Sequence, residues 1–203
     1  MTEEANPIPP IPETPIPQPP ESSEGREFIN TLNYAVEFLK MDFRNLERVA
    51  NDPKMPVWVI VILAISGVAS AIGTLNIAGI IINPILSVIF GSLFLALFWV
   101  IAGPLFGGKA SIVQHYSALG LLSVVQWISV IPIIGPIVSF FIFFYLVFVY
   151  QKMIKLLHDL SDGKAWAVVL IPIAVVLFIG LMLFVVFGLA ILGIATAAAA
   201  GGG

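Results

Sequence analysis

The sequence has no cysteine and few charged residues. The absence of cysteine excludes disulfides, thiolate metal sites, iron–sulfur clusters and cysteine nucleophiles. Charged side chains make up 10% of the chain, against about 25% in soluble globular proteins. The hydrophobic fraction is 59% and the mean hydropathy is +1.05. This composition indicates an integral membrane protein, and the net charge of −3 gives no reason to expect nucleic-acid binding.

Charge is missing altogether from three long tracts, 55–108, 110–151 and 165–203. A helix needs about 20 apolar residues to cross the hydrocarbon core of a bilayer. The first two tracts are therefore each long enough for two crossings, and the third for one. Turn residues divide the tracts and predict five spans, near 56–75, 84–106, 111–130, 137–150 and 165–189. The expected fold is an all-α, five-helix transmembrane bundle; a hairpin around Gly180 in the last tract stays open.

The distribution of basic residues predicts the orientation. If the N-terminus is cytoplasmic, five spans place residues 1–55, 107–110 and 151–164 on the cytoplasmic side. All nine basic and all twelve acidic residues fall in these segments. Lys and Arg are enriched in cytoplasmic loops, so we expect the N-terminus inside and the C-terminus outside. The membrane is the plasma membrane if the chain is prokaryotic.

The predicted domains follow from composition. Residues 1–25 form a proline-rich tail that cannot build a packed core, and serve either as a disordered tether or as a ligand for a proline-binding partner. Residues 26–52 carry apolar side chains at helical spacing and predict a cytoplasmic amphipathic helix, which lies flat on the membrane or docks against the cytoplasmic ends of the spans. Residues 53–195 form the membrane domain, and 196–203 a low-complexity tail.

The stretch GPLFGGKAS, residues 103–111, has the spacing of a phosphate-binding P-loop as far as Lys109. A P-loop needs Ser or Thr directly after the lysine to hold magnesium, and it follows a β-strand. Here Ala110 takes that position, Ser111 comes one residue late, and a predicted span precedes the loop. We therefore interpret the stretch as a cytoplasmic turn made by Gly107 and Gly108, with Ser111 as the cap of the third span.

Few residues are candidates for chemistry. Gln114, His115 and Gln126 are polar residues of the third predicted span, with either a packing role or a functional intramembrane role. His158 lies close to two acids, Asp159 and Asp162, in a segment that we interpret as a solvated loop. No catalytic motif occurs and no acid lies within a predicted span, so we expect no enzymatic activity and no cofactor or metal. Small residues at 66, 67, 70 and 71 favour close helix packing.

The chain resembles the Yip membrane family, named for interaction with Ypt/Rab GTPases, and especially its prokaryotic branch. The resemblance rests on an N-terminal segment before five packed spans and on three sequence stretches. These are FGGKAS at 106–111, YSALGLLSV at 116–124 followed by Pro132 and Pro136, and LLHDLSDGKAWAVVLIP at 156–172. Eukaryotic relatives carry an acidic-Leu-Tyr-Gly-Pro type of motif before the first span, where this chain has NDPKMP.

The resemblance implies a non-enzymatic membrane organiser or trafficking-like scaffold that acts through its cytoplasmic face. Its expected partners are the lipid bilayer, membrane proteins or small-GTPase-like proteins, and other copies or sister chains. The candidate interaction loops comprise Gly107, Gly108, Lys109, Ser111, His158 and Lys164. The alternative is a small-solute permease or channel that uses Gln114, His115 and Gln126.

Overall fold

The computed structural model describes residues 23–132 and 134–201, and in that part of the chain all regular structure is helical. The predicted proline-rich tail therefore lies almost wholly outside the described residues. The elements in chain order are α1 Ser23–Leu39, α2 Leu46–Asn51, α3 Met55–Gly73, α4 Gly79–Val100, the π-helical turn η1 Ile101–Leu105, α5 Ile112–Gly120, the 3₁₀ helix η2 Leu121–Val130, α6 Ile134–His158 and α7 Asp162–Gly201.

Four helices in the described part are long and apolar enough to cross a membrane: Met55–Gly73, Gly79–Leu105, Ile137–His158 and Asp162–Leu189. They coincide with the first, second, fourth and fifth predicted spans. The start of the second was predicted too late, since α4 begins at Gly79 and contains Pro84 in its interior. The side-chain oxygen of Asn76 accepts the N–H of Gly79 at 3.0 Å, which helps to start the helix before the proline is reached.

The third predicted span is not among these four helices, because its backbone changes form halfway. Its first half is α5, of 9 residues, and its second half is η2, of 10 residues. At about 1.5 Å per α-helical residue and 2.0 Å per 3₁₀ residue the two halves together extend about 34 Å. The hydrocarbon core is about 30 Å thick. The segment therefore has the length of a crossing without being one continuous α-helix.

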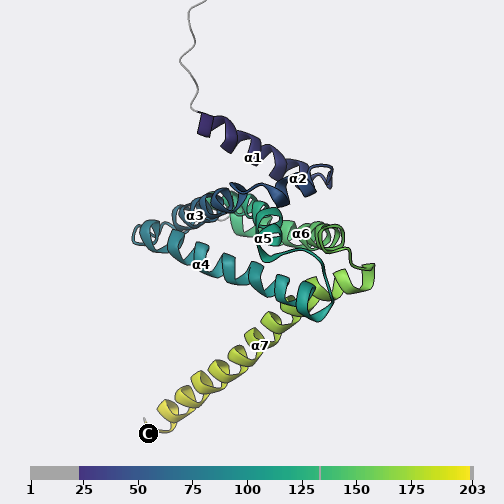
Figure 1. Ribbon diagram of the computed structural model, residues 1–203. Coiled ribbons are helices and arrows are strands. Elements are labelled where there is room, and N and C mark those ends of the chain that lie inside the picture. The colour runs from purple at the N-terminus through teal and green to yellow at the C-terminus, as the bar shows by residue number, and fades with distance from the viewer. Residues whose placement is uncertain (1–22, 133, 202–203) are drawn as a thin grey trace, which may run out of the picture.

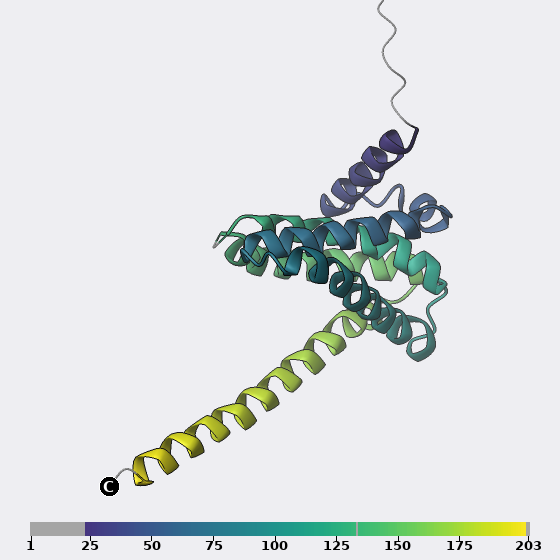
Figure 2. The ribbon, with the colours of Figure 1, turned by 90° about the vertical axis from the view of Figure 1, so that its left-hand side faces the viewer.

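The last helix, α7, runs without a break through Gly180 as far as Gly201, so the hairpin left open by the sequence does not form. Figures 1 and 2 show its C-terminal half leaving the other helices and extending alone. Large apolar side chains there are exposed, for example Phe184 at 75%. A soluble protein rarely exposes so long an apolar surface, whereas hydrocarbon chains cover it in a bilayer.

Close packing of α3 against its neighbours depends on the small residues noted in the sequence. A Cβ atom added to Gly67 would lie 2.5 Å from the carbonyl oxygen of Asn83 and from Pro84 Cα, so only glycine lets α4 approach α3 here. The buried Ser66 hydroxyl lies 2.8 Å from the Ile62 carbonyl and 3.0 Å from the Ser123 carbonyl of η2. These contacts support the small-residue packing that the sequence predicted.

The predicted amphipathic segment 26–52 is two helices, not one. The chain turns after Leu39, where Met41 has a φ of 60° and the Asp42 N–H bonds to the Glu37 carbonyl at 2.9 Å. This bond closes the end of α1, in the manner of a Schellman cap. Both α1 and α2 pack on one side of the bundle (Figure 1), with Phe28 and Trp58 rings 5.3 Å apart. Docking is thus observed, but α1 lies against η2 and against the middle of α6, where the Tyr145 hydroxyl donates to the Leu39 carbonyl, and not only at the ends of the helices as predicted.

Candidate functional site

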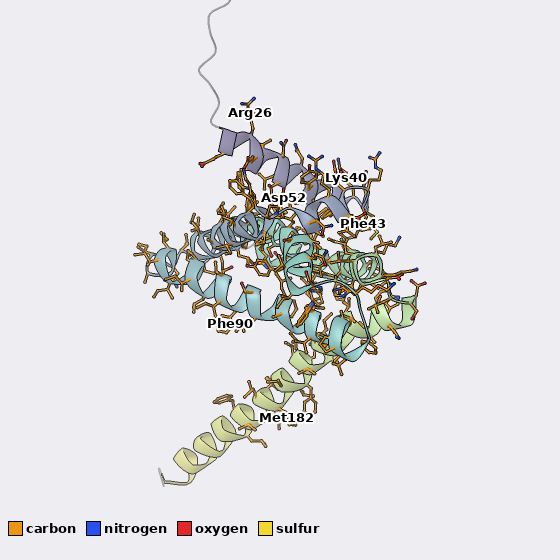
Figure 3. All side chains as sticks on the ribbon, viewed as in Figure 1. Arg26, Lys40, Phe43, Asp52, Phe90 and Met182 are labelled. Carbon is orange, nitrogen blue, oxygen red and sulfur yellow. The ribbon has the colours of Figure 1, made fainter. Side chains whose placement is uncertain are left out.

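One end of the bundle collects the polar segments that lie far apart in sequence. The C-terminal ends of α4–η1 and α6 meet the N-terminal ends of α5 and α7 there, and α2 lies beside them. We call this end, with the adjoining flank of the bundle that α1 covers, the polar face; it comprises α1 with the turn up to Asn45, α2 with the turn up to Lys54, the loop 106–111 and the residues 151–164. In Figure 3, Arg26 of α1 and Lys40, directly after α1, lie on the side of the molecule that α1 covers, whereas Phe90 and Met182 lie on the opposite side.

The loop 106–111 is a tight turn, as predicted. Gly107 has a φ of +76°, a left-handed conformation that glycine adopts without strain. The Gly108 N–H donates to the Ala102 carbonyl at 2.8 Å. Helix and π-turn precede the loop rather than a strand, and the Lys109 ammonium pairs with Asp159 at 2.5 Å. The backbone context that a P-loop requires is therefore missing here.

The first turn of α5 is capped and joined to α2. Ser111 Oγ accepts the Gln114 N–H at 3.2 Å, and Gln114 Oε1 accepts the Ser111 N–H at 2.8 Å. This reciprocal pair is a capping box, and it confirms the predicted cap. The amide nitrogen of the same Gln114 side chain donates to Asn51 Oδ1 of α2 at 2.8 Å. Gln114 thus links the start of α5 to α2 at the edge of the polar face.

Two histidines meet beneath the loop. His115 of α5 and His158 at the end of α6 are both 0% exposed. Nδ1 of His115 lies 2.8 Å from Nε2 of His158, so one ring donates a hydrogen bond to the other. The two remaining ring nitrogens, His115 Nε2 and His158 Nδ1, are buried without a hydrogen-bond partner. A buried unpaired nitrogen costs about 1–3 kcal/mol, so this pair stands out as the chemically unusual feature of the chain.

The loop packs directly on the second ring. A Cβ atom added to Gly108 would lie 2.5 Å from His158 Nδ1 and 2.6 Å from the Ala102 carbonyl oxygen. The next residue, Lys109, donates its backbone N–H to the His158 carbonyl at 3.2 Å. His158 is therefore held from the loop side by backbone and from α5 by His115. The lack of a side chain at Gly108 is what permits this approach.

The charged side chains that follow His158 make ion pairs or hydrogen bonds. The hydrogen bond from Lys109 lowers the pKa of the Asp159 carboxyl below its ordinary value. Asp162 pairs with Lys155 at 2.8 Å, and Lys164 donates to the Phe106 carbonyl at 3.1 Å. Among the described residues, no group of three or more His, Asp or Glu side chains is placed to hold a metal ion. His158, Asp159 and Asp162, close together in sequence, thus have separate partners. The interpretation of this segment as a solvated loop was wrong for His158, which is the last residue of α6 and is buried.

The three polar residues of the alternative permease hypothesis lie in separate cavities. Gln114 lines a surface cavity of about 300 Å³ beside α2, and His115 lines an apolar groove of about 420 Å³ between α4 and α5. Gln126 lies in η2 and lines two other cavities, of about 140 and 330 Å³. The described residues bring His115 to His158 but do not bring Gln114, His115 and Gln126 into one shared cavity.

The histidine pair was not predicted, although the sequence carries a signal for it. His115 stands one turn after the loop 106–111, and His158 stands at the end of the next long helix. Helices that run antiparallel bring the start of one next to the end of the other. The predicted topology therefore places both histidines at the same end of the bundle, and combining it with their positions would have suggested contact.

Comparison with known protein families gave one match. The family model described as the Yip1 domain matches residues 40–185. Neither the curated proteins nor the solved structures gave a match. The matched region holds the loop 106–111, both histidines and every described helix except α1 and the C-terminal part of α7. Because the match covers more than two thirds of the sequence, the chain belongs to the Yip1 domain family of membrane proteins.

Proposed function

We propose that this chain is a non-enzymatic scaffold that organises protein partners at a membrane through its polar face. The observation that carries the proposal is the assembly of that face from four sequence segments. Lys54 of the α2–α3 turn pairs with Glu27 of α1 at 2.6 Å, and Gln114 and Lys109 join α5 and its loop to α2 and to the end of α6. A surface held together in this way is pre-organised, which lowers the entropy cost of binding a partner.

The topology that goes with this function has five crossings, with α5–η2 as the third. The length of that segment, and the burial of its middle residues Leu119, Leu121 and Leu122 against neighbouring helices, support the assignment. The N-terminus and the polar face are then cytoplasmic and the C-terminal end of α7 is outside, since every Lys and Arg lies on one side. In a prokaryotic cell the membrane is the plasma membrane.

The charges of the polar face favour a protein partner over an anionic lipid surface. Lipid-binding segments carry clusters of four to eight Lys and Arg. Here acidic and basic side chains alternate and several neutralise one another, as Lys109 with Asp159 and Lys155 with Asp162. Mixed charge suits a complementary protein surface, where it gives specificity and steers encounter. Membrane proteins, small GTPases and other copies of the chain are the partner classes we expect.

Photocrosslinking in native membranes tests the proposal. A benzophenone amino acid placed at Lys40 or Lys152, both exposed on the polar face, is compared with one at Phe184 on the apolar side of α7. We expect discrete protein adducts from the first two positions and lipid adducts from the third. The proposal fails if correctly folded protein gives no reproducible protein adduct at either polar position. Solute flux through purified protein in liposomes would instead support the permease.

A further inference from the structure

A second cavity of the polar face lies between α1, the end of α2 and the first turn of α3. Its volume is about 300 Å³, which is within the range of small-molecule sites. Asp52 lies there between α1 and the membrane helices (Figure 3). The wall carries charge of both signs beside two aromatic rings. Its charged and aromatic side chains are Glu27, Tyr34, Arg48, Asp52, Lys54 and Trp58.

The basic side chains of this cavity have hydrogen-bond donors to spare. Among the described residues, the Arg48 guanidinium forms no ion pair or hydrogen bond, and it lies 5.9 Å from the centroid of the Tyr34 ring. The Lys54 ammonium has three donors and pairs with Glu27 at 2.6 Å, which leaves two donors. Phosphate oxygens accept several charge-assisted hydrogen bonds at once, and arginine binds them in a bidentate manner. The wall therefore offers an unused position for a phosphate.

The same wall carries carboxylate oxygens that lack a donor. Oδ1 of Asp52 accepts the Lys54 N–H at 2.9 Å, and Oε1 of Glu27 accepts the Lys54 ammonium. The second oxygen of each carboxylate has no donor among the described residues. Two basic and two acidic side chains also leave the wall without net charge, so a purely anionic ligand gains little there. The arrangement is complementary to a zwitterion that joins a phosphate to a cation.

The position of the cavity on α3 places it among lipid headgroups. α3 begins at Met55 and is long and apolar enough to cross a membrane. Trp58 stands one turn inside it, and tryptophan is enriched at the interface between membrane and water. Val57, one turn after Lys54, is 60% exposed, so an apolar path leads from the cavity along the lipid-facing side of α3. A ligand with a charged end and apolar chains fits both surfaces.

The donors and rings of the wall distinguish the two common zwitterionic headgroups. The ammonium of ethanolamine has three N–H donors, which carboxylates accept. The trimethylammonium of choline has none and is recognised by the faces of aromatic rings. Here Arg48 lies over the Tyr34 ring, and the Trp58 ring packs with Phe28 at 5.3 Å. The carboxylates are thus the groups left to bind the cation, and they favour ethanolamine.

We infer that this cavity binds the headgroup of phosphatidylethanolamine, with its phosphate on the two basic side chains and its ammonium on the two carboxylates of the wall. The acyl chains then lie along the start of α3. Because the wall is shared by α1, α2 and α3, a bound headgroup joins the amphipathic segment to the first membrane helix. This lipid site is separate from the contacts with protein partners proposed above.

The test measures lipid binding to the purified, delipidated full chain by native mass spectrometry. The probes are synthetic phosphatidylethanolamine, phosphatidylcholine and phosphatidylglycerol with the same two acyl chains. Arg48→Gln removes the free cation, and Asp52→Asn removes the charge but keeps an oxygen for the Lys54 N–H. Arg44→Gln and Glu47→Gln change exposed charges outside the cavity wall and serve as matched controls. Circular dichroism confirms that each variant is folded.

We expect the wild type to bind phosphatidylethanolamine about tenfold more tightly than the other two lipids, as hydrogen bonds between charged groups predict. Arg48→Gln should weaken all three, since all share the phosphate, and Asp52→Asn should weaken phosphatidylethanolamine alone. The two controls should bind as the wild type does. Equal binding of the three lipids by the wild type, or tighter binding of phosphatidylglycerol, overturns the headgroup assignment. Equal effects of Arg48→Gln and Arg44→Gln, or of Asp52→Asn and Glu47→Gln, overturn the site.

Discussion

Replacing Gly108 with alanine tests whether the loop 106–111 truly rests on the histidine pair. The added Cβ would lie 2.5 Å from His158 Nδ1, 2.6 Å from the Ala102 carbonyl oxygen and 2.8 Å from His158 Cβ. Real Cβ atoms do not approach so closely, so the loop must move or the end of α6 must give way. Since one of the three atoms belongs to the backbone of η1, a rotation of the imidazole alone cannot relieve the contact.

The expected cost follows from overpacking, which typically destabilises a packed site by about 1–3 kcal/mol. Gly163 provides a matched control, because it lies in the first turn of α7 and a Cβ added there meets nothing within 4 Å. Gly163→Ala should be neutral or stabilise the chain by up to about 1 kcal/mol, since alanine restricts the unfolded chain more than glycine does. The same glycine-to-alanine change should therefore lower the free energy of unfolding at position 108 and leave it unchanged or raise it at position 163.

The difference in the free energy of unfolding is measured by reversible unfolding of the purified chain in mixed micelles, with tryptophan fluorescence as the signal. Trp99 is a local reporter, because its indole N–H donates to the Ala110 carbonyl of the same loop at 3.0 Å. In a background whose other three tryptophans are replaced by phenylalanine, a shift of the Trp99 emission at native conditions would show that the loop has moved in Gly108→Ala. Equal free energies of unfolding for Gly108→Ala and Gly163→Ala would refute the packing of the loop on His158.

Three further outcomes are expected. Leucine at His115 leaves a ring nitrogen of His158 buried and unpaired, so the free energy of unfolding should fall by about 1–3 kcal/mol, and the double leucine variant should lose less than the sum of the two single losses. Ser66→Ala removes a buried hydroxyl bound to η2 and should cost about 0.5–1.5 kcal/mol, whereas Ser87→Ala on α4 should cost less in the same assay. The pKa of the Asp159 carboxyl is lowered in the folded chain. The carboxylate therefore contributes to the free energy of unfolding above the ordinary Asp pKa of about 3.9, and this contribution is lost as the pH falls through the lowered pKa. Asp159→Asn should remove this loss of stability at acid pH. It should leave the midpoint of unfolding at neutral pH nearly unchanged, since exposed ion pairs contribute little.

Long charge-free tracts made most of the membrane helices predictable. A run such as 55–73 has no alternative to a helix in lipid, because every backbone polar group must bond within its own segment. The turn at Gly107 and Gly108 and the cap at Ser111 were equally predictable, since their chemistry is local. These features depend on residues within one helical turn of each other, and the printed sequence contains all of that information.

Features that depend on packing between distant segments were harder to predict. No residue pattern within the segment 111–130 predicts the change from α5 to η2. The change occurs at Gly120, which packs against Val59 of α3, a residue far away in the sequence. The start of α4 was misplaced because Pro84 was expected at the first helical turn, whereas tertiary packing tolerates it inside. The break at Met41 was hidden because a stripe of apolar residues at spacings of three and four, from Phe28 through Val36 to Ala50, continues across it. In the structure Val36 is 45% exposed, whereas Phe38, which is outside the stripe, is fully buried.

Accessibility of single cysteines tests the one-sided polar face most directly, and the chain is suited to it because it has no native cysteine. Cysteines at Lys40, Lys109 and Gly163 on the polar face, and at Asn76 and Ile131 in the opposite connections, are exposed to a membrane-impermeant maleimide in intact bacterial cells. In intact cells we predict labelling at positions 76 and 131 only. Positions 40, 109 and 163 should become labelled once the membrane is permeabilised. Labelling of position 109 or 163 in intact cells, or opposite behaviour of 76 and 131, would contradict the account.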